Sequence, residues 1–454
     1  MIQAVRSAFA LPDLRKKILI TLLILGIYRL AAHVPVPGVN SAALDQLFAT
    51  NQLLGLLDLL SGGAMAQFSV MAMGVYPYIT ATIVMQLLTP IIPALQNLQE
   101  EGEQGRNKLN QYAWYLTVPL AALNAYGQAV IMTQMSGEPI LAEFGFRDAP
   151  LTTLAIVASM TAGTLFAVWL GELISEQGIG NGTSIIILGG IVTRLPVRLA
   201  NMIGLEQWLS LIFFLIITTI TVFGIVIIQE GKLMIWVQYS SRTLGQRGGR
   251  LRQTRSVRTH IPLRVNMAGM IPLIFAQSLM IFPSTIASYF MAPTGQEPQN
   301  FVQTAAYYVD RIFNPQYDIY WPLYFLMVVG FTYFYTDVIF QQQNMAENLR
   351  KQGASIPGIR PGKRTEQYLT QKVRRITLVG ALFLGLVAVL PWLVDLLVRL
   401  LPNVGAGVTG SSIMIISSTG LLIVVGVILD TMRQLEAQLQ MRHYDKFLRK
   451  GILG

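Results

Sequence analysis

The sequence of 454 residues contains no cysteine, three histidines and few charged residues, which make up 12% of the chain. Without cysteine, the protein can form no disulfide bond, thiolate metal site or iron–sulfur cluster. The histidines, His33, His260 and His443, lie far apart in the sequence, so we expect neither a metal site nor a cofactor. A phosphate-binding loop, a nucleophile elbow and a histidine pair at zinc spacing are also missing, and we therefore do not expect an enzyme.

Hydrophobic residues, in contrast, make up 53% of the chain and are concentrated in long runs without charge. A helix needs about 20 mostly apolar residues to cross a bilayer. Ten runs predict an all-α polytopic membrane protein, with spans at roughly Ile18–Val34, Phe68–Ile91, Tyr112–Gln134, Leu151–Leu170, Ser184–Thr193, Trp208–Ile228, Val265–Phe282, Tyr320–Thr336, Ile376–Leu393 and Ile413–Leu429. The first run lacks a small-residue cleavage pattern, so we expect it to remain as a span. The fifth is the shortest and must continue past Arg194 and Arg198.

The distribution of Lys and Arg predicts the side of the membrane on which each loop lies. If the N-terminus is cytoplasmic, 27 of the 33 Lys and Arg fall on the cytoplasmic side. They lie chiefly in residues 1–17, in the loops 232–264 and 341–375, and in the tail 432–454. The other six are Arg29, Arg147, Arg194, Arg198, Arg311 and Arg399. We therefore predict that both termini are cytoplasmic.

The predicted spans divide into two sets of five, in residues 18–203 and 204–431. Because each set holds an odd number of spans, the second set must run inverted relative to the first, as in many transporters and channels. GVYPYITATIVM in span two and GMIPLIFAQSLM in span seven align without gaps. The matched pairs are Gly74 with Gly269, Pro77 with Pro272, Ile79 with Ile274, Ala81 with Ala276 and Met85 with Met280. Matched helix breaks point to a central site; chance agreement among apolar residues is the alternative.

Several longer motifs occur in order through both halves. They are YRLAAHVPVPGV, MGVYPYITATIVMQLLTP, GELISEQGIGNGTSIIIL, IPLRVNMAGMIPLIFA, ENLRKQGASIPGIRPGKRTEQYL and LLIVVGVILD. Together they resemble the SecY family, the channel subunit of the bacterial Sec protein translocase, nearly from end to end. The resemblance implies ten helices around a central hourglass pore through which secreted chains cross the cell membrane. It also implies a seam between spans two and three and spans seven and eight, through which hydrophobic segments leave sideways into lipid.

The resemblance further implies a ring of apolar side chains at the waist of the pore. Its positions in this chain are Ile79, Ile83, Thr183, Ile187, Ile274 and Ile423. β-branched side chains are stiff, and an apolar constriction excludes ions. Thr183 departs from the apolar pattern, so either its methyl group turns inward or the other five side chains form the seal. Ordinary helix packing is the alternative for any one of these residues.

The segment LLSGGAMAQFSV, residues 59–70, is too apolar for an aqueous loop and too short for a span. The resemblance implies a plug, a short helix that folds back from the outside beneath the ring. Its residues are Ser61, Gly62, Gly63, Ala64, Met65, Ala66, Gln67 and Phe68. The glycines loosen the hinge, and Ala and Met give weak, adaptable contacts, so we expect the plug to leave readily. An external amphipathic helix on the membrane surface is the alternative.

Two cytoplasmic loops predict docking sites for anions. Residues 240–264 contain seven Arg and no acidic residue, and dense Arg without aromatics favours contacts to phosphate or carboxylate. Three partners could supply these anionic groups: the backbone of ribosomal RNA, anionic lipids and an acidic face of a motor protein. In PGIRPG, two Pro-Gly pairs stiffen the tip that carries Arg360. The predicted docking residues are Arg242, Arg247, Arg250, Arg252, Arg255, Arg258 and Arg360; the positive-inside rule is the alternative for any one of them.

Because the chain carries no ATP site, the driving force for transport must come from partners. The resemblance implies the small membrane subunits SecE and SecG, the SecA motor ATPase, and the ribosome during co-translational insertion. Signal peptides and nascent chains are the implied substrates.

Two other classes of protein remain open at this point. A secondary transporter of small solutes would share the inverted repeat, but transporters usually keep an acidic residue near the midplane. The acidic residues here lie at predicted span ends: Glu172, Glu230, Asp337, Asp395 and Asp430. Asp337, in FYTDVIF, is the one that could support a transporter. A membrane-embedded scaffold or receptor would explain the basic loops but not the matched helix breaks.

Overall fold

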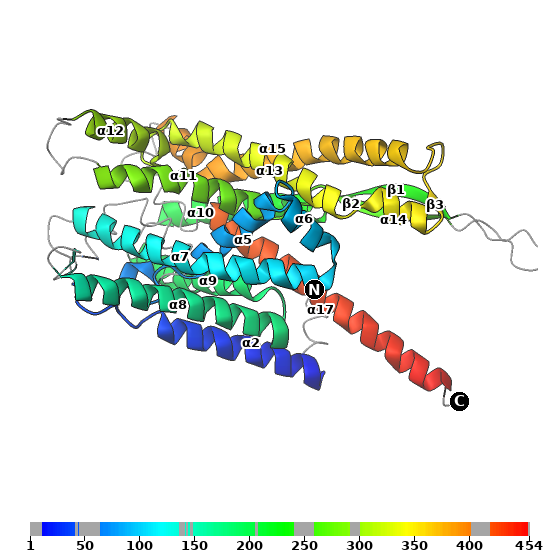
Figure 1. The fold of residues 1–454 in the computed structure, drawn as a ribbon, viewed down its shortest axis with the longest axis horizontal. Helices are drawn as coiled ribbons and strands as arrows, with labels where there is room; N and C mark the ends of the chain where they lie inside the picture. The colour runs from blue at the N-terminus through cyan, green and yellow to red at the C-terminus, as the bar shows by residue number, and fades with distance from the viewer. Residues whose placement is uncertain are drawn as a thin grey trace, which may run out of the picture.

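The computed structural model describes residues 11–40, 44, 64–135, 141, 144–145, 149–204, 208–239, 258–290, 300–400 and 418–452. Within these ranges the chain forms long helices and one small sheet (Figure 1). Most of the long helices run roughly parallel to the longest axis of the molecule. The prediction of a helical body is confirmed, while the sheet was not predicted.

Each of the ten predicted spans overlaps one helix. These helices are α2 (Pro12–Ala31), α5 (Tyr76–Leu88), α7 (Glu103–Met135), α8 (Pro150–Gln177), α9 (Gly182–Gly204), α10 (Trp208–Glu230), α11 (Ile271–Phe290), α13 (Tyr320–Gln342), α15 (Lys363–Leu400) and α17 (Ser418–Ile452). Charge-free apolar runs therefore located the helices, although several helices continue well past the apolar run into polar sequence.

Four helical segments of the described residues are long and apolar enough to cross a membrane: Pro150–Gln177, Leu211–Glu230, Tyr320–Lys351 and Lys363–Leu397. A fifth is obtained if α5 and α6 (Pro93–Glu100), which meet at a bend of 97°, count as one span. Helices α9 and α11 contain shorter apolar segments, Gly182–Thr193 and Ile271–Met280. The chain is thus a multi-pass helical membrane protein, and the number of ten spans stays a prediction.

Two helices begin later than the sequence predicted. Span two was expected from Phe68, but α5 begins at Tyr76, and span seven was expected from Val265, but α11 begins at Ile271. In both cases a Gly-containing turn precedes the helix, and a proline occupies its first turn, where the missing N–H costs nothing. The residues before each helix are apolar because they are buried, so hydrophobicity alone could not separate turn from helix.

The centre of the helical body is one apolar cluster to which helices from both ends of the chain contribute. Its fully buried members include Ile174 of α8, Val328 of α13 and Ile423 of α17, each 0% exposed. The helices that pack most extensively are α13 with α15, α5 with α7, and α11 with α12 (Phe301–Phe313). This cluster contains residues as far apart in the sequence as Ile24 and Leu429. Their joint burial favours one helical body over two separate domains.

A small antiparallel sheet lies at one end of the helical body (Figure 1). Its strands are β1 (Lys232–Tyr239), β2 (Arg258–Arg264) and β3 (Ala354–Ser355), in the order β2-β1-β3. Side chains alternate along β1, so Ile235 and Val237 point into an apolar cluster with Leu369 and Val373 of α15. The predicted loops 232–264 and 341–375 therefore share one folded unit, which also contains α14 (Met345–Lys351).

Candidate functional site

The predicted ring residues come from four helices, and most of them are buried. Ile83, Ile187, Ile274 and Ile423 are 3%, 3%, 4% and 0% exposed. Ile187 of α9, Ile274 of α11 and Ile423 of α17 belong to the central apolar cluster, and Ile79 of α5 packs against it. The fold thus brings side chains from helices two, five, seven and ten of the predicted order into one apolar centre.

The two other ring positions have different surroundings. Ile83 lines a small cavity between α5, α11 and α13, together with Phe275 and Tyr335. Thr183 lies against α8, because a Cβ atom on Gly171 would be 3.4 Å from its Oγ1 atom. Whether these six residues close a pore stays a prediction.

The predicted plug is described from Ala64 onward, while Ser61, Gly62 and Gly63 lie outside the described residues. Met65–Gln67 form one turn of 3-10 helix, η1, so the segment is helical, though only briefly. Ala64 belongs to the same apolar cluster as the ring residues Ile187, Ile274 and Ile423. The described part of the segment therefore begins in the same buried cluster as these three ring residues.

The end of the plug segment is bound more firmly than the sequence suggested. Met65 and Phe68 are 1% and 0% exposed and pack with residues of α7 and α8, such as Ala129 and Met160. The Phe68 carbonyl oxygen accepts a hydrogen bond of 3.0 Å from the Val36 N–H. Weak contacts were expected from the Ala and Met side chains, but Met65 is as deeply buried as Phe68, and that the plug leaves readily stays a prediction.

The chain just after Phe68 is also held closely. The Val70 N–H donates to the Val34 carbonyl at 3.0 Å, and Ser69 pairs with Pro35, so this stretch is joined to the segment that follows α2. On the other side, Gly163 of α8 leaves no room for a side chain, since a Cβ atom there would be 2.0 Å from the Val70 carbonyl oxygen. The chain is therefore held on two sides immediately after the predicted plug.

The predicted docking residues are described only in part. Arg242, Arg247, Arg250, Arg252 and Arg255 lie outside the described residues, and Arg258 is the first residue of β2. Arg360 is exposed in a turn in which Gly358 and Gly362 both have positive φ, 81° and 104°. The Arg360 carbonyl accepts a hydrogen bond from Thr365 Oγ1 at 3.0 Å.

The sheet joins the two basic loops. Strand β3 leads into the Arg360 turn and pairs with β1, with Gln238 opposite Ser355 and Tyr239 opposite Ala354. Ile356, which follows β3, is buried in the cluster beneath the sheet. The base of loop 232–264 and the Arg360 tip are thus fixed relative to each other. Pairing between residues more than 100 positions apart left no signal in the local sequence.

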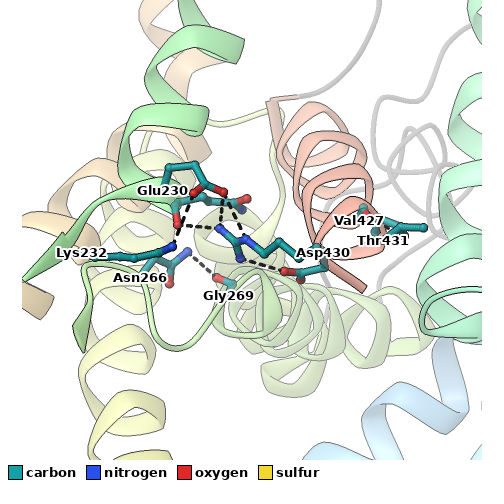
Figure 2. A network of polar contacts seen from close by, with 9 residues as sticks. Glu230, Lys232, Asn266, Gly269, Val427, Asp430 and Thr431 are labelled. Carbon is teal, nitrogen blue, oxygen red and sulfur yellow. Dashed lines mark hydrogen bonds and ion pairs between the residues drawn. The ribbon is translucent and has the colours of Figure 1, made fainter. Parts of the chain in front are cut away.

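A polar network that the sequence analysis did not identify joins α10, β1 and α17 (Figure 2). Arg433 of α17 donates from Nη2 to Glu230 Oε1 at 2.6 Å and to the Gln229 carbonyl at 3.1 Å, and from Nη1 to Asp430 Oδ1 at 3.1 Å. Lys232 Nζ lies 3.9 Å from Glu230. The guanidinium therefore satisfies the carbonyl end of α10 just before α17 projects away from the body (Figure 1).

The acidic residues that could have indicated a transporter have neighbouring partners. Asp337 Oδ2 lies 3.6 Å from Arg374 Nη2 and accepts a hydrogen bond from Gln341 at 3.1 Å. Glu172 accepts a hydrogen bond from the Trp114 indole of α7. Among the residues that the structure describes, no group of three or more His, Asp or Glu is placed to hold a metal ion.

The fold is that of the multi-pass channels that conduct proteins. A solved structure described as a protein conducting channel matches with a TM-score of 0.62 and 16% identity, covering 93% of this chain and 92% of that one. A structure of Sec61 in the canine ribosome-channel complex matches with a TM-score of 0.60, 16% identity and the same coverage. At this identity the likeness shows the fold alone.

Sequence similarity identifies the family. The SecY family model matches residues 69–432. The chain is 39% identical over 462 residues to the protein translocase subunit SecY of Thermotoga maritima, covering 99% of both chains. It is 38% identical over 463 residues to SecY of Thermus thermophilus, covering 100% of this chain and 99% of that one. The chain belongs to the SecY family.

Proposed function

We propose that this chain is the channel subunit of a Sec protein translocase. It passes secretory proteins across the cell membrane and releases hydrophobic segments sideways into lipid, with both of its termini in the cytoplasm. One observation carries the proposal: α5, α9, α11 and α17 bring Ile79, Ile187, Ile274 and Ile423 to one apolar centre in a chain of the SecY family. The paired Asp337 removes the main argument for a transporter of small solutes.

The ring closes the channel by dewetting. Stiff isoleucine side chains around a narrow waist exclude water and ions, yet they part around a polypeptide because no covalent or ionic bond holds them together. Ala64, Met71 and Val75 lie in the same apolar cluster and support the closed ring from the plug side. Movement of residues 61–64 away from the ring accompanies opening, while Met65 and Phe68 remain packed against α7 and α8, and Phe68 and Val70 remain hydrogen-bonded to the segment that follows α2.

The two halves are related by an inverted repeat. Gly74 and Gly269 occupy matched positions before α5 and α11, and both have positive φ, 51° and 66°. Two helices that begin in the same way, after the same break, fit a duplicated five-helix unit.

The cytoplasmic sheet and its two basic loops form the docking platform for the SecA motor and the ribosome. Arg360 lies in a turn held by hydrogen bonds, and the Arg-rich stretch 240–257 lies in the sequence between the paired strands β1 and β2. Guanidinium groups suit both the phosphates of ribosomal RNA and the carboxylates of a motor protein. SecE and SecG complete the complex within the membrane, and anionic lipids contact the basic cytoplasmic side.

The pore can be tested by disulfide crosslinking, because the chain contains no cysteine of its own. Ile187→Cys in the apolar centre is compared with Ile220→Cys on the outer face of α10, where Ile220 is 67% exposed. A secretory substrate stalled during transport carries one cysteine in its membrane-crossing segment. We expect a disulfide with position 187 and none with position 220. Equal crosslinking at both positions would contradict the central path.

A further inference from the structure

Helix α17 belongs to the second predicted half of the chain, but residues 432–439, here called the strap, pack against the first half. Leu435 of the strap forms a buried cluster with Leu14 of α2 and Ile179 of the turn between α8 and α9, and the three side chains are 6%, 2% and 5% exposed. Residues 432, 435 and 439 follow helical spacing, so one side of α17 faces the first half. The partly buried side chains around the cluster are Leu11, Ile18, Met432 and Leu439.

The turn between α8 and α9 approaches both α2 and α17 closely. The Ile179 N–H donates to Thr21 Oγ1 of α2 at 3.2 Å. Gly180 has a φ of 82°, and a Cβ atom there would lie 3.0 Å from Thr431 Oγ1 of α17 and 2.8 Å from the side chain of Ile185. This glycine therefore permits the turn to pack directly on α17, so the three elements form one packed unit.

The other side of α17 is bound to the second half. Arg433 donates to Glu230 at 2.6 Å and to the Gln229 carbonyl at 3.1 Å, both at the end of α10. One turn and a half earlier, Gly426 brings α17 close to α10, because a Cβ atom there would lie 3.1 Å from Gln229 Nε2. The start of the strap is thus joined by polar contacts to α10 and by apolar contacts to α2.

The described helices of the two halves pack on each other mainly along two lines. One line is α9 with α10 and α17, and the other is α5 and α7 with α11. The first line is the more extensive. Sideways exit at the seam requires the second line to open. When two bodies in contact along two lines separate along one of them, the other line becomes the axis of the movement.

An axis needs two fixed points, and the chain itself supplies one. It passes from the first half to the second between Gly204, where α9 ends, and Trp208, where α10 begins. The strap lies at the opposite end of α9, because Ile179 shortly precedes the start of α9 at Gly182. Helix α9 has 23 residues. The two points are therefore separated by roughly 35 Å, the length of this helix.

We propose that the strap is the second hinge point of the channel: it stays closed while the seam opens, and the halves turn about the line from the strap to the α9–α10 connection. The inference rests on the proposed function, because it assumes opening at the seam. Leucine and isoleucine contacts suit a pivot, since apolar attraction is non-directional and tolerates a small rotation. The Arg433 bonds keep the strap attached to the second half during that rotation.

The test compares two crosslinks in a chain that has no cysteine of its own. The strap pair is Leu11→Cys with Leu439→Cys, at the partly buried edge of the cluster. The seam pair is Leu87→Cys of α5 with Phe334→Cys of α13, which line the same small cavity. Each protein is assembled with its native partner subunits in inverted membrane vesicles and treated with a flexible bismaleimide. The measured quantity is the rate at which a secretory protein enters the vesicles, before and after crosslinking.

We expect the strap crosslink to leave the transport rate unchanged and the seam crosslink to abolish transport. A second variant, Leu435→Ala, removes most of the central contact of the strap and should slow transport. Crosslinking the strap pair in the same chain should then restore the rate, because the covalent link replaces the lost contact; a merely misfolded protein would not be rescued. Met441→Ala is the matched control, on the same helix beyond the strap, where Met441 is 62% exposed, and it should transport like wild type.

Three results would overturn the inference: loss of transport with the strap crosslink, a wild-type rate in Leu435→Ala, or a slow Leu435→Ala protein that the crosslink does not restore. Failure of the proposed function gives a different result, because the vesicles then take up no secretory protein even before crosslinking.

Discussion

Gly74 and Gly269, which lie 195 positions apart, adopt the same left-handed backbone conformation, each two residues before the start of a helix, α5 or α11. Their φ angles are 51° and 66°. At Gly269 the turn is also held by Asn266, whose Nδ2 donates to the Gly269 carbonyl at 3.0 Å (Figure 2). The agreement extends from sequence position to backbone conformation, which chance matching of apolar residues would not produce.

The first prediction concerns this turn. Gly269→Ala should destabilise the protein by about 1–2 kcal/mol, because an L-residue is strained at positive φ. The cost is purely conformational, since a Cβ atom at Gly269 meets no described atom within 4 Å. Gly330→Ala is the control: this position in α13 is equally open but has ordinary helical φ, so alanine should be neutral or slightly stabilising. Thermal unfolding in detergent measures both, and equal melting temperatures would contradict the argument.

The second prediction concerns the ring. Ile79→Asn and Ile274→Asn should each loosen the closed state and permit export of proteins with defective signal sequences, because an amide at the waist favours water there. Ile79→Val and Ile274→Val keep the surface apolar and serve as controls. Export of a reporter with a defective signal sequence is the measurement. Unchanged export in both Asn variants would remove these residues from the ring.

The third prediction concerns the buried contacts at the end of the plug segment. Phe68→Ala should destabilise the fold by about 3–5 kcal/mol, because Phe68 is 0% exposed and its removal leaves a cavity beside α7 and α8. Gln67→Ala, at the exposed neighbouring side chain, should have little effect. The measurement is the melting temperature of each variant relative to wild type. A stable Phe68→Ala protein would mean that the segment as a whole is mobile.

The fourth prediction concerns docking. Arg360→Glu should weaken SecA or ribosome binding while leaving folding intact, because the side chain is exposed and the turn is held by backbone bonds and by Thr365. Arg360→Gln, which removes charge without reversing it, should lie between wild type and Arg360→Glu. The measurement is the affinity of SecA, and of ribosomes, for vesicles that contain each variant, at two salt concentrations. Wild-type affinity in Arg360→Glu would exclude this residue as a contact.

The fifth prediction concerns the network in Figure 2. Arg433→Gln should lower stability by about 1 kcal/mol: it removes the bonds to Glu230 and to the carbonyl end of α10, but solvent already screens the partly exposed Glu230. Arg433→Lys keeps the charge but reaches fewer of these acceptors, so its stability should lie between those of wild type and Arg433→Gln. Thermal unfolding is the measurement, and an unchanged Arg433→Gln protein would show that the network does not stabilise the junction.

The sequence by itself determined where the helices lie. Charge-free runs located ten helices, and the SecY motifs identified the family, because both signals are local and continuous in the chain. Helix starts at α5 and α11 were misplaced by 8 and 6 residues, since Phe68 and Val265 were expected and Tyr76 and Ile271 were observed. An apolar residue in a buried turn has the same hydrophobicity as one in a helix.

Only the tertiary structure decided which distant segments meet. Gln238 pairs with Ser355 in the sheet, Tyr335 of α13 donates a hydrogen bond to Gln86 of α5, and Arg433 binds Glu230 at the end of α10. None of these residues is marked by spacing or composition, because a polar side chain at a helix or strand end is equally consistent with exposure to water. Their partners are fixed by how the helices pack, so the contacts exist only after the whole body has formed.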